Sequence, residues 1–312
     1  MSSTNPFAII LVGPTGVGKT AVSLELAKQL TMQAEIVSAD SRQIYEYMDI
    51  GTAKLSIWER DEPQHHFIDI REPNEAYSAG EFSEEARNEI WEILAMGNWP
   101  IVVGGSGLYL RALLEGFFEP KISNREIQTQ LQQRAETEGS RKLHAELTKI
   151  DPVCAAGLHP NDAHRIVRAL EIYHAGGKLP SAVRLYPNYP AEFIYRIIGL
   201  DMPRPALYER INQRVDKMLA DGLVDECKRL LEMGFSPKLN ALKTVGYQEV
   251  FQFLGNEISY DEMLELIKQH TRNYAKRQMT WFRKMSGVEW FDIKPEDSPE
   301  KIAALVRLYL NI

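Results

Sequence analysis

The sequence contains few cysteines and no long apolar run. Cys154 and Cys227 are the 2 cysteines of the chain, and two thiols so far apart argue against a disulfide framework and against a cysteine zinc site. No apolar stretch approaches the roughly 20 residues that a membrane-spanning helix needs. Residues 1–6 include no basic segment of the kind that opens a secretory signal. We therefore expect a cytoplasmic protein without membrane contact.

Positive charge is also scarce. The 36 Lys and Arg residues are outnumbered by 43 Asp and Glu residues, which gives a formal net charge of −7. Such a charge discourages nucleic-acid binding unless basic residues gather locally. The hydrophobic share of 44% is that of an ordinary globular protein. Because 312 residues exceed the ~100–200 typical of one domain, we expect a core domain with a second lobe.

A glycine-rich segment near the N-terminus carries the strongest signal. Residues 7–12 form an apolar run typical of a buried strand, residues 13–20 fit the pattern G-x-x-x-x-G-K-[ST], and residues 21–30 continue as an amphipathic helix. Glycines in such a loop let successive N–H groups point inward at the positive end of the helix dipole, where a polyanion binds. A chance glycine-rich turn is the alternative, but it does not explain the order of strand, loop and helix. The expected anion-binding residues are Gly13, Pro14, Thr15, Gly16, Val17, Gly18, Lys19 and Thr20, with the Thr20 hydroxyl as a ligand of Mg²⁺.

Two further predicted strands end in polar residues. The apolar runs at residues 35–39 and 100–103 lead to Asp40 and to a glycine-rich turn that contains Ser106. In an open parallel sheet, ligands bind beyond the carboxyl ends of the strands, so both side chains should lie near the phosphate loop. As alternatives, Asp40 caps a helix or holds Mg²⁺ through water, and the second turn is a helix start that needs small residues.

The order of apolar runs predicts an α/β fold with a parallel sheet flanked by helices and an inserted all-helical lobe. Further short strands are expected at residues 65–70 and 193–200. Between residues 120 and 190, apolar residues occur only at helical spacing. We therefore divide the chain into a first core part (residues 1–119), the inserted lobe (120–191) and a second core part (192–312).

A predicted helix at residues 205–219 carries two arginines that project together. Arg210 and Arg214 are four residues apart, so they share one face of the helix. Two interpretations are open. The arginines reach the phosphate site, or they pair with Asp216 and Glu209 on the helix surface.

Basic residues gather locally in two places. Arg165 and Arg168 share a face of a lobe helix, which spacing alone favours as a solvated surface. Residues 268–284 contain six Lys or Arg and no Asp or Glu, and an amphipathic basic helix of this kind is typical of nucleic-acid binding rather than lipid binding. Its expected faces are Lys268, Arg272, Lys276 and Arg283 on the basic side, and Ile267, Tyr274, Trp281 and Met285 on the apolar side.

Five segments together resemble a known family. Residues 13–20, 38–43, 103–109, 161–168 and 274–281 are similar, in order and spacing, to the motifs of bacterial tRNA dimethylallyltransferases. The resemblance covers nearly the whole chain. It implies a P-loop NTPase-like core, cytoplasmic location, a monomer, and transfer of a dimethylallyl group from dimethylallyl diphosphate to tRNA. The acceptor in the family is the N6 amine of the adenosine 3′ of the anticodon, position 37, in tRNAs that read codons starting with U, and the products are N6-isopentenyladenosine and diphosphate.

The resemblance also implies roles for single residues. Asp40 matches the general base of the family, and Ser106 stands where threonine is usual. Lys19, Thr20 with Mg²⁺, and Arg210 or Arg214 would stabilise the diphosphate. Residues implied in tRNA binding, chiefly to the anticodon stem-loop, are Asp40, Ser41, Arg42, Gln43, Ser106, Gln128, His164, Arg165, Ile166, Val167, Arg168, Lys243, Gly246, Tyr247, Asn273, Lys276, Arg277 and Gln278.

One position departs from the family pattern. Gln128 occupies a place where many relatives have an arginine facing the tRNA. A phosphate contact is therefore expected to be weaker here or to be made elsewhere, by Arg125 or Arg134.

Three other functions compete with tRNA prenylation. A small-molecule kinase would use the phosphate loop and Asp40 but has little use for the basic segment at residues 268–284. An isopentenyltransferase acting on free adenine nucleotides would not need the lobe with its arginines. A non-catalytic RNA-binding protein would not need Lys19, Thr20 and Asp40 together.

Overall fold

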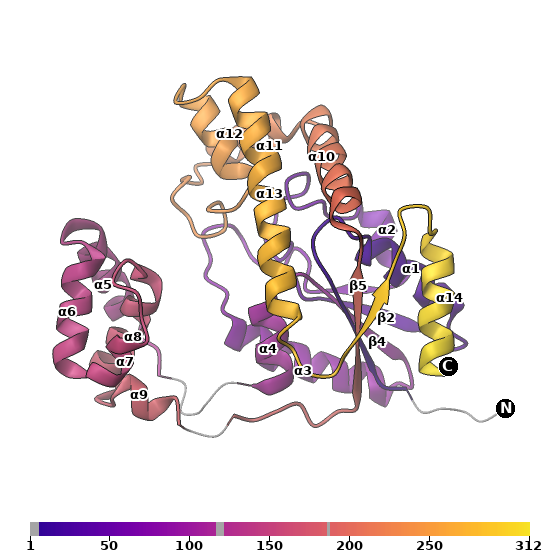
Figure 1. Cartoon of the computed structure of the whole chain (residues 1–312), viewed down its shortest axis with the longest axis horizontal. Helices are drawn as coiled ribbons and strands as arrows, with labels where there is room; N and C mark the ends of the chain where they lie inside the picture. Colours follow the sequence, from indigo (N-terminus) through magenta and orange to yellow (C-terminus); the bar gives the residue numbers. More distant parts are fainter. Residues whose placement is uncertain (1–5, 117–121, 186–187) are drawn as a thin grey trace. The chain divides into compact units, whose positions relative to one another are not determined.

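The chain forms two compact units. A computed structural model describes residues 6–116, 122–185 and 188–312. Contacts divide it into a core (Met1–Leu114 with Ala191–Ile312) and a lobe (Glu115–Pro190) (Figure 1). The boundary expected between residues 119 and 120 lies outside the described residues, and the chain re-enters the core one residue before the expected position. Within the described residues, no helix combines the length and the apolar character needed to cross a bilayer.

The core is built on a six-stranded sheet in which all the paired strands run parallel, in the order β3-β2-β4-β1-β5-β6. This confirms the expected α/β fold with a parallel sheet flanked by helices. Residue Ile10 of the central strand pairs with Val102 on one side and Ile197 on the other. The strands are β1 (Ala8–Val12), β2 (Ala34–Ser38), β3 (His65–His66), β4 (Trp99–Val103), β5 (Tyr195–Asp201) and β6 (Val288–Asp292).

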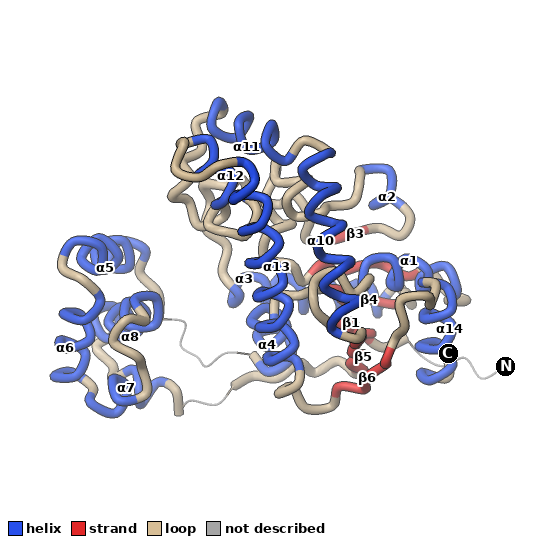
Figure 2. The backbone as a smooth tube through the Cα atoms, turned by 45° about the horizontal axis from the view of Figure 1, so that its top comes forward, coloured by secondary structure: helices blue, strands red, loops and turns tan. Residues whose placement is uncertain are grey.

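Helices cover both faces of the sheet (Figure 2). Alternate residues of β1 point to opposite layers, as side chains of a strand must. Ile10 belongs to the same buried cluster as Phe82 of α3, whereas Ile9 belongs to the cluster that contains Leu26 of α1 and Val306 of α14. The core helices are α1 (Lys19–Gln29), α2 (Ile57–Asp61), α3 (Ala79–Ala95), α4 (Gly107–Glu115), α10 (Arg204–Ala220), α11 (Leu223–Glu232), α12 (Tyr247–Leu254), α13 (Tyr260–Phe282) and α14 (Pro299–Leu310).

Some elements differ from the sequence prediction. The strand expected at residues 65–70 is only two residues long, because Phe67 and Asp69 have φ angles of +63° and +54°, which extended strands do not contain. The elements α2, α12, β6 and α14 have no counterpart in the prediction. Strand β6 is only partly buried, so it lacks the continuous apolar run by which the other strands are detected.

Helix α13 contains residues 268–282 of the basic segment, and Arg283 caps its C-terminus. The helix begins earlier than the segment, at a capping box formed by Ser259 and Glu262. Its buried residues are Met263, Ile267, Ala275, Gln278 and Phe282. The apolar stripe expected from the sequence is therefore wrong at Trp281, which is 37% exposed. The reason is a shift of the buried face by one residue, from position 281 to position 282.

The expected basic face of α13 is largely engaged with the core. Lys268 forms an ion pair of 2.7 Å with Asp216 of the neighbouring helix α10, and Arg272 donates to Asn212 of that helix at 2.7 Å. Farther along, Arg283 pairs with the acidic residue at the end of β5. These contacts fix α13 against α10 and β5.

The lobe is an all-helical unit with its own apolar core. Leu143, Leu147 and Ile166 are fully buried there. The buried Glu171 carboxylate accepts a hydrogen bond from the backbone N–H of Asn124 at 3.0 Å. It also forms an ion pair with Arg168 at 2.8 Å. The lobe helices are α5 (Arg125–Thr137), α6 (Ser140–Ile150), α7 (Pro152–Ala156), α8 (Ala163–Gly176) and α9 (Pro180–Val183).

A buried glutamate of α11 organises a loop of the core. The Glu226 carboxylate accepts hydrogen bonds from the N–H groups of Asp49, Ile50 and Gly51, at 3.0, 2.7 and 3.1 Å. It also accepts one from the hydroxyl of buried Tyr247, at 2.6 Å. Four donors thus satisfy a charge that would otherwise be costly to bury.

Replacing this carboxylate should destabilise the core. Glu226→Ala leaves buried donors unpaired, so we expect the free energy of unfolding to fall by about 2–4 kcal/mol. Urea denaturation followed by circular dichroism measures the change. The control is Glu232→Ala, an exposed glutamate of the same helix, which should change stability by less than about 0.5 kcal/mol. Equal effects of the two substitutions would contradict the role of Glu226.

Candidate active site

The phosphate loop closes around its own lysine. It connects β1 to α1, and Gly16 and Gly18 have φ angles of +83° and +105°, a region that favours glycine. The Lys19 ammonium donates to the carbonyl oxygens of Gly13 and Pro14 at 2.9 and 3.0 Å. Since the residue that caps α1 is Gly18, no side chain covers the first N–H groups of the helix. The loop therefore presents a cation and open amides to an anion.

The second glycine-rich turn lies directly beside the end of β2. The Ser41 N–H donates to Ser106 Oγ at 3.0 Å, and the two hydroxyl oxygens are 3.1 Å apart. A Cβ atom on Gly104 would lie 2.2 Å from the Ala39 carbonyl oxygen, so only glycine fits there. The structure thus brings Ser106 next to Asp40, as the strand order predicts.

Asp40 begins a tight turn and carries its charge toward the phosphate loop. Its Oδ1 atom accepts from the N–H groups of Arg42 and Gln43 at 2.8 and 3.4 Å. The residues that follow form a turn, not a helix, so the expected capping role applies to this turn. Burial lowers the pKa of both Lys19 and Arg214, and the negative charge of Asp40 partly opposes this effect by favouring their protonated forms.

The two arginines of α10 extend to the phosphate loop. Arg214 Nη1 lies 3.4 Å from the Thr15 hydroxyl, and the Arg210 guanidinium lies 3.6 Å from the position of a Cβ atom on Gly18. Their expected alternative partners bind elsewhere: Asp216 pairs with Lys268, and Glu209 accepts from Gln213. Burial lowers the pKa of Arg214, which marks a site with little water.

Helix α13 reaches the same place through Gln278. Its Oε1 accepts from the Thr15 N–H at 2.8 Å, and its Nε2 donates to the Gly105 carbonyl at 2.9 Å. One side chain therefore joins the phosphate loop to the second glycine-rich turn. No local sequence pattern signals this contact, because Gln278 lies more than 170 positions away from either turn.

Comparison with known proteins agrees with this geometry. Residues 43–285 match the protein family described as IPP transferase. The chain belongs to the IPP transferase family. It is 46% identical to the tRNA dimethylallyltransferase of Carboxydothermus hydrogenoformans, over 94% of each chain, and 43% identical to that of Bacillus subtilis, over 95% of this chain and 93% of the relative.

Solved structures lead to the same family. The crystal structure of the full-length tRNA isopentenylpyrophosphate transferase of Bacillus halodurans is 38% identical, with a TM-score of 0.72, and the match covers 99% of this chain and 96% of that one. A eukaryotic dimethylallyltransferase acting on tRNA is 29% identical, with a TM-score of 0.82 over 98% of this chain and 80% of that one.

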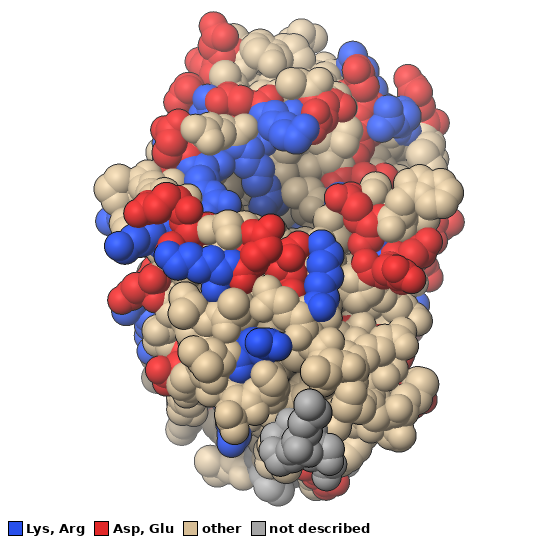
Figure 3. Space-filling model, turned by 90° about the vertical axis from the view of Figure 1, so that its right-hand side faces the viewer, with Lys and Arg blue, Asp and Glu red and all other residues tan. Residues whose placement is uncertain are grey.

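In this IPP transferase family member, a cavity of about 770 Å³ is lined by residues between positions 46 and 69 and by residues at the C-terminal part of α10. Arg214 of α10 forms part of its wall, together with Lys54, Arg60 and Asp69. Apolar residues of the same wall include Ile57 and Met218. On the face drawn in Figure 3, Lys and Arg side chains gather along a hollow, with Asp and Glu side chains around it.

The core residues implied in RNA binding separate into exposed and buried sets. Lys243, Asn273, Lys276 and Arg277 are exposed. Arg42 and Gln43 are partly buried and bond to the protein. Arg42 donates to the Asn240 carbonyl at 2.7 Å, and Gln43 donates to the Thr52 carbonyl at 3.2 Å. The buried set consists of Gly246, Tyr247 and Gln278.

The lobe residues divide in the same way. His164 and Arg165 are exposed on α8, whereas the side chains of Ile166 and Val167 lie in the lobe core. Their side chains therefore contribute to the packing of the lobe, and the predicted role of these two residues in RNA binding stays a prediction. Arg168 is half-exposed and pairs with Glu171.

The position of Gln128 and its expected substitutes is also defined. Gln128 is partly buried on α5, and Arg125 is exposed at the start of that helix. Arg134 forms ion pairs with Glu138 and Glu146, at 2.8 and 2.7 Å. Of the two arginines, Arg125 is therefore the better placed to contact a phosphate.

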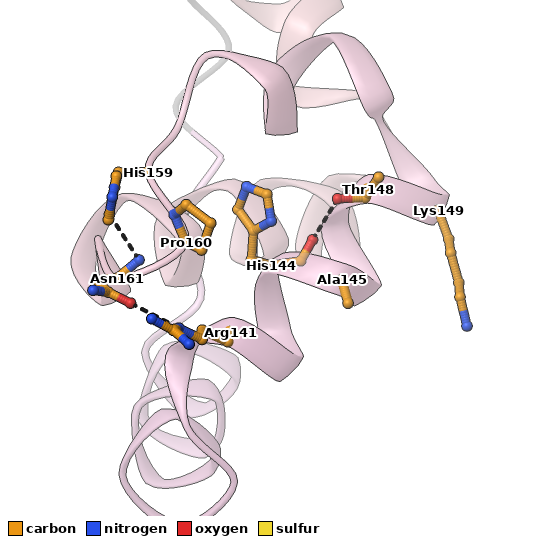
Figure 4. A pocket seen from close by; sticks show the side chains of 8 residues that line it. All are labelled: Arg141, His144, Ala145, Thr148, Lys149, His159, Pro160 and Asn161. Atoms are coloured by element: carbon orange, nitrogen blue, oxygen red, sulfur yellow. Dashed lines mark hydrogen bonds between the residues drawn. The ribbon is translucent and has the colours of Figure 1, made fainter.

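A second cavity, of about 600 Å³, lies within the lobe (Figure 4). Its polar residues bond mainly to protein groups. Arg141 donates to Asn161, whose N–H donates to His159, and His144 lies 3.1 Å from the carbonyls of both Ala155 and Leu158. This arrangement resembles a packed loop more than a ligand site.

The Lys19 ammonium should make anion binding depend on pH. Its burial lowers its pKa to about 8, so the free protein loses this proton at a pH where an exposed lysine keeps it. A bound polyanion favours the charged form. Above pH 8, binding therefore requires proton uptake, and affinity for inorganic diphosphate should fall about tenfold or more between pH 7 and pH 9.5.

Calorimetric titration with diphosphate measures this dependence. Lys19→Met should bind more weakly at pH 7 and lose less affinity as the pH rises, and the ionisation of diphosphate itself is common to both proteins. The same pH slope in both proteins would show that Lys19 is not the titrating group.

Proposed function

We propose that the protein transfers a dimethylallyl group from dimethylallyl diphosphate to the N6 amine of the adenosine at position 37 of tRNAs that read codons starting with U. The relatives named as tRNA dimethylallyltransferases support the reaction class. The observation that carries the proposal is that the parallel strands β1, β4 and β2 end at one edge of the sheet, where Asp40 follows β2 and interacts electrostatically with Lys19 of the phosphate loop and with Arg214. A carboxylate next to a polyanion site suits proton removal from an acceptor while diphosphate departs. We expect a cytoplasmic monomer.

The phosphate loop is the proposed diphosphate site. Lys19, the amides that begin α1, and the guanidinium groups of Arg210 and Arg214 supply the positive potential. Diphosphate leaves readily only if its growing charge is stabilised. Placing these donors in a poorly solvated site strengthens each interaction.

Mg²⁺ is the proposed cofactor. Among the described residues, no three His, Cys, Asp or Glu side chains are arranged to hold a metal, whereas Thr20 is exposed on the first turn of α1. This fits an ion carried mainly by diphosphate oxygens and water, because Mg²⁺ at phosphate sites takes few protein ligands. When bound, Mg²⁺ would neutralise diphosphate charge.

Asp40 is the proposed general base. The adenine amine is a poor nucleophile because its lone pair is delocalised into the ring. As the nitrogen forms a bond to C1 of the dimethylallyl group, the bond from C1 to the diphosphate oxygen breaks, and diphosphate keeps that electron pair. The proton lost from nitrogen passes to the Asp40 carboxylate. Ser106, held by Ser41, would orient the acceptor.

The RNA side of the site is proposed to use exposed basic residues. Bases inside a stacked anticodon loop must be turned outward to enter an enzyme pocket. Lys276 and Arg277 of α13 and Lys243 lie exposed on the core, and Arg165 lies exposed on the lobe. Phosphate contacts from these side chains would hold the anticodon stem-loop.

Asp40→Asn should abolish transfer without abolishing RNA binding. Asparagine keeps an oxygen to accept from the Arg42 and Gln43 amides but cannot take a proton. We expect transfer of labelled dimethylallyl to tRNA to slow about 10²–10⁴-fold, with tRNA affinity within a few-fold. Asp225→Asn, on the exposed face of α11, is the control. Near-normal turnover of Asp40→Asn would remove Asp40 from the role of base. If the wild-type protein transferred labelled dimethylallyl to AMP and not to tRNA, the acceptor would be a free nucleotide.

Neutralising Lys276 and Arg277 should weaken tRNA binding and its salt dependence. If each side chain neutralises one phosphate, the double alanine variant should reduce the slope of log K against log salt by about 1 to 2. Filter binding over a salt series measures the slope. Lys28→Ala with Lys301→Ala makes the same change in net charge on α1 and α14 and should leave the slope unchanged. An unchanged slope in the first variant would place α13 away from RNA phosphate.

A further inference from the structure

Gln278 faces the core although its neighbours in sequence face solvent. It is 6% exposed, and it shares the buried side of α13 with Ala275 and Phe282, three residues before it and four after it. Lys276 and Arg277 are exposed on the same turn. The family resemblance implies RNA contact for Gln278, but its side chain lies on the opposite side from the basic pair.

Both ends of the Gln278 amide are occupied by backbone groups. The acceptor end receives the Thr15 N–H at 2.8 Å, and the donor end reaches the Gly105 carbonyl at 2.9 Å. The opposite orientation of the amide would set donor against donor and acceptor against acceptor, so the two contacts fix it in one direction.

The second turn is shaped to receive this helix. A Cβ atom on Gly105 would lie 2.2 Å from Gln278 Nε2, and one on Gly107 would lie 2.4 Å from the Trp281 indole. A side chain at Gly105 would displace the Gln278 amide, and one at Gly107 would displace the Trp281 indole. Glycine at both positions therefore permits the close approach that the amide contacts need.

We propose that Gln278 is a positioning residue that holds the phosphate loop in its anion-binding conformation, and that it does not contact RNA. This deepens the proposed function and rests on it. A loop with glycines at positions 13, 16 and 18 loses much conformational freedom when it orders. Holding Thr15 in place before the donor arrives reduces that cost, so the contact should contribute to donor affinity.

The two possible roles of Gln278 predict opposite changes. Gln278→Met keeps the shape of the side chain but leaves the Thr15 N–H and Gly105 carbonyl unpaired. We expect the Kd for inorganic diphosphate with Mg²⁺, measured without tRNA, to rise about tenfold or more, and the KM for dimethylallyl diphosphate to rise with it. The Kd for tRNA, measured without donor, should stay within about twofold.

Matched variants on the same helix define the comparison. Gln269→Met makes the same substitution at an exposed glutamine of α13 and should change neither constant. The Lys276→Ala/Arg277→Ala variant should show the reverse pattern, with weaker tRNA binding and unchanged diphosphate binding. Weaker tRNA binding by Gln278→Met, or diphosphate binding equal to the wild type, would overturn the proposal.

A second variant tests the hydrogen bonds themselves. In Gln278→Glu, the ionised carboxylate still accepts from Thr15 but repels the Gly105 carbonyl, whereas the protonated acid can accept from one and donate to the other, as glutamine does. Its diphosphate affinity, relative to the wild type, should therefore recover as the pH falls from 8 to 5.5. A flat ratio over this pH range would overturn the proposal. Wild-type protein that binds no diphosphate would instead overturn the proposed function.

Discussion

The site depends on the crowding of charged groups where the strands end. The sheet order brings the ends of β1, β2 and β4 together, and α10 adds Arg214 beside Thr15. Lys19, Arg214 and Asp40 thereby lie in a region with little water. Burial lowers the pKa of both cations there, and the Asp40 carboxylate partly opposes this effect. The two cations outnumber the one carboxylate, so a bound polyanion would balance the charge of this group.

Buried carboxylates solve a related problem away from the site. Glu226 in the core accepts hydrogen bonds from three backbone N–H groups and from a tyrosine hydroxyl. Glu171 in the lobe accepts hydrogen bonds from the backbone N–H of Asn124, the residue that caps α5, and from the Arg168 guanidinium. Each carboxylate holds a polar segment in one conformation, because several donors converge on one buried charge. Two of the donors, Tyr247 and Arg168, are residues that the family resemblance links to RNA.

Local patterns made much of the fold and site predictable. The glycine and lysine spacing of residues 13–20 specifies the phosphate loop, and the rule for parallel sheets is enough to bring Asp40 and Ser106 to it. What could not be predicted depends on packing between distant segments. Whether Arg214 reaches the loop or pairs on its own helix is decided by the neighbour Lys268, which takes Asp216. The burial of Ile166, Val167 and Gln278 is likewise decided by the helices they face. Strand β6 escaped prediction because it is only partly covered.

The last two elements of the fold bear on how the protein is made. Strand β6 pairs with β5, and α14 packs along α1, where Gln29 donates to the Glu300 carbonyl. Helix α1 is the same helix whose first residues carry the phosphate loop. During synthesis from the N-terminus, the loop is therefore translated long before the layer that covers its helix. The phosphate loop and its helix reach their final packing only after residues 288–310 have left the ribosome, so a prematurely terminated chain would contain the motif without the helix that packs against α1.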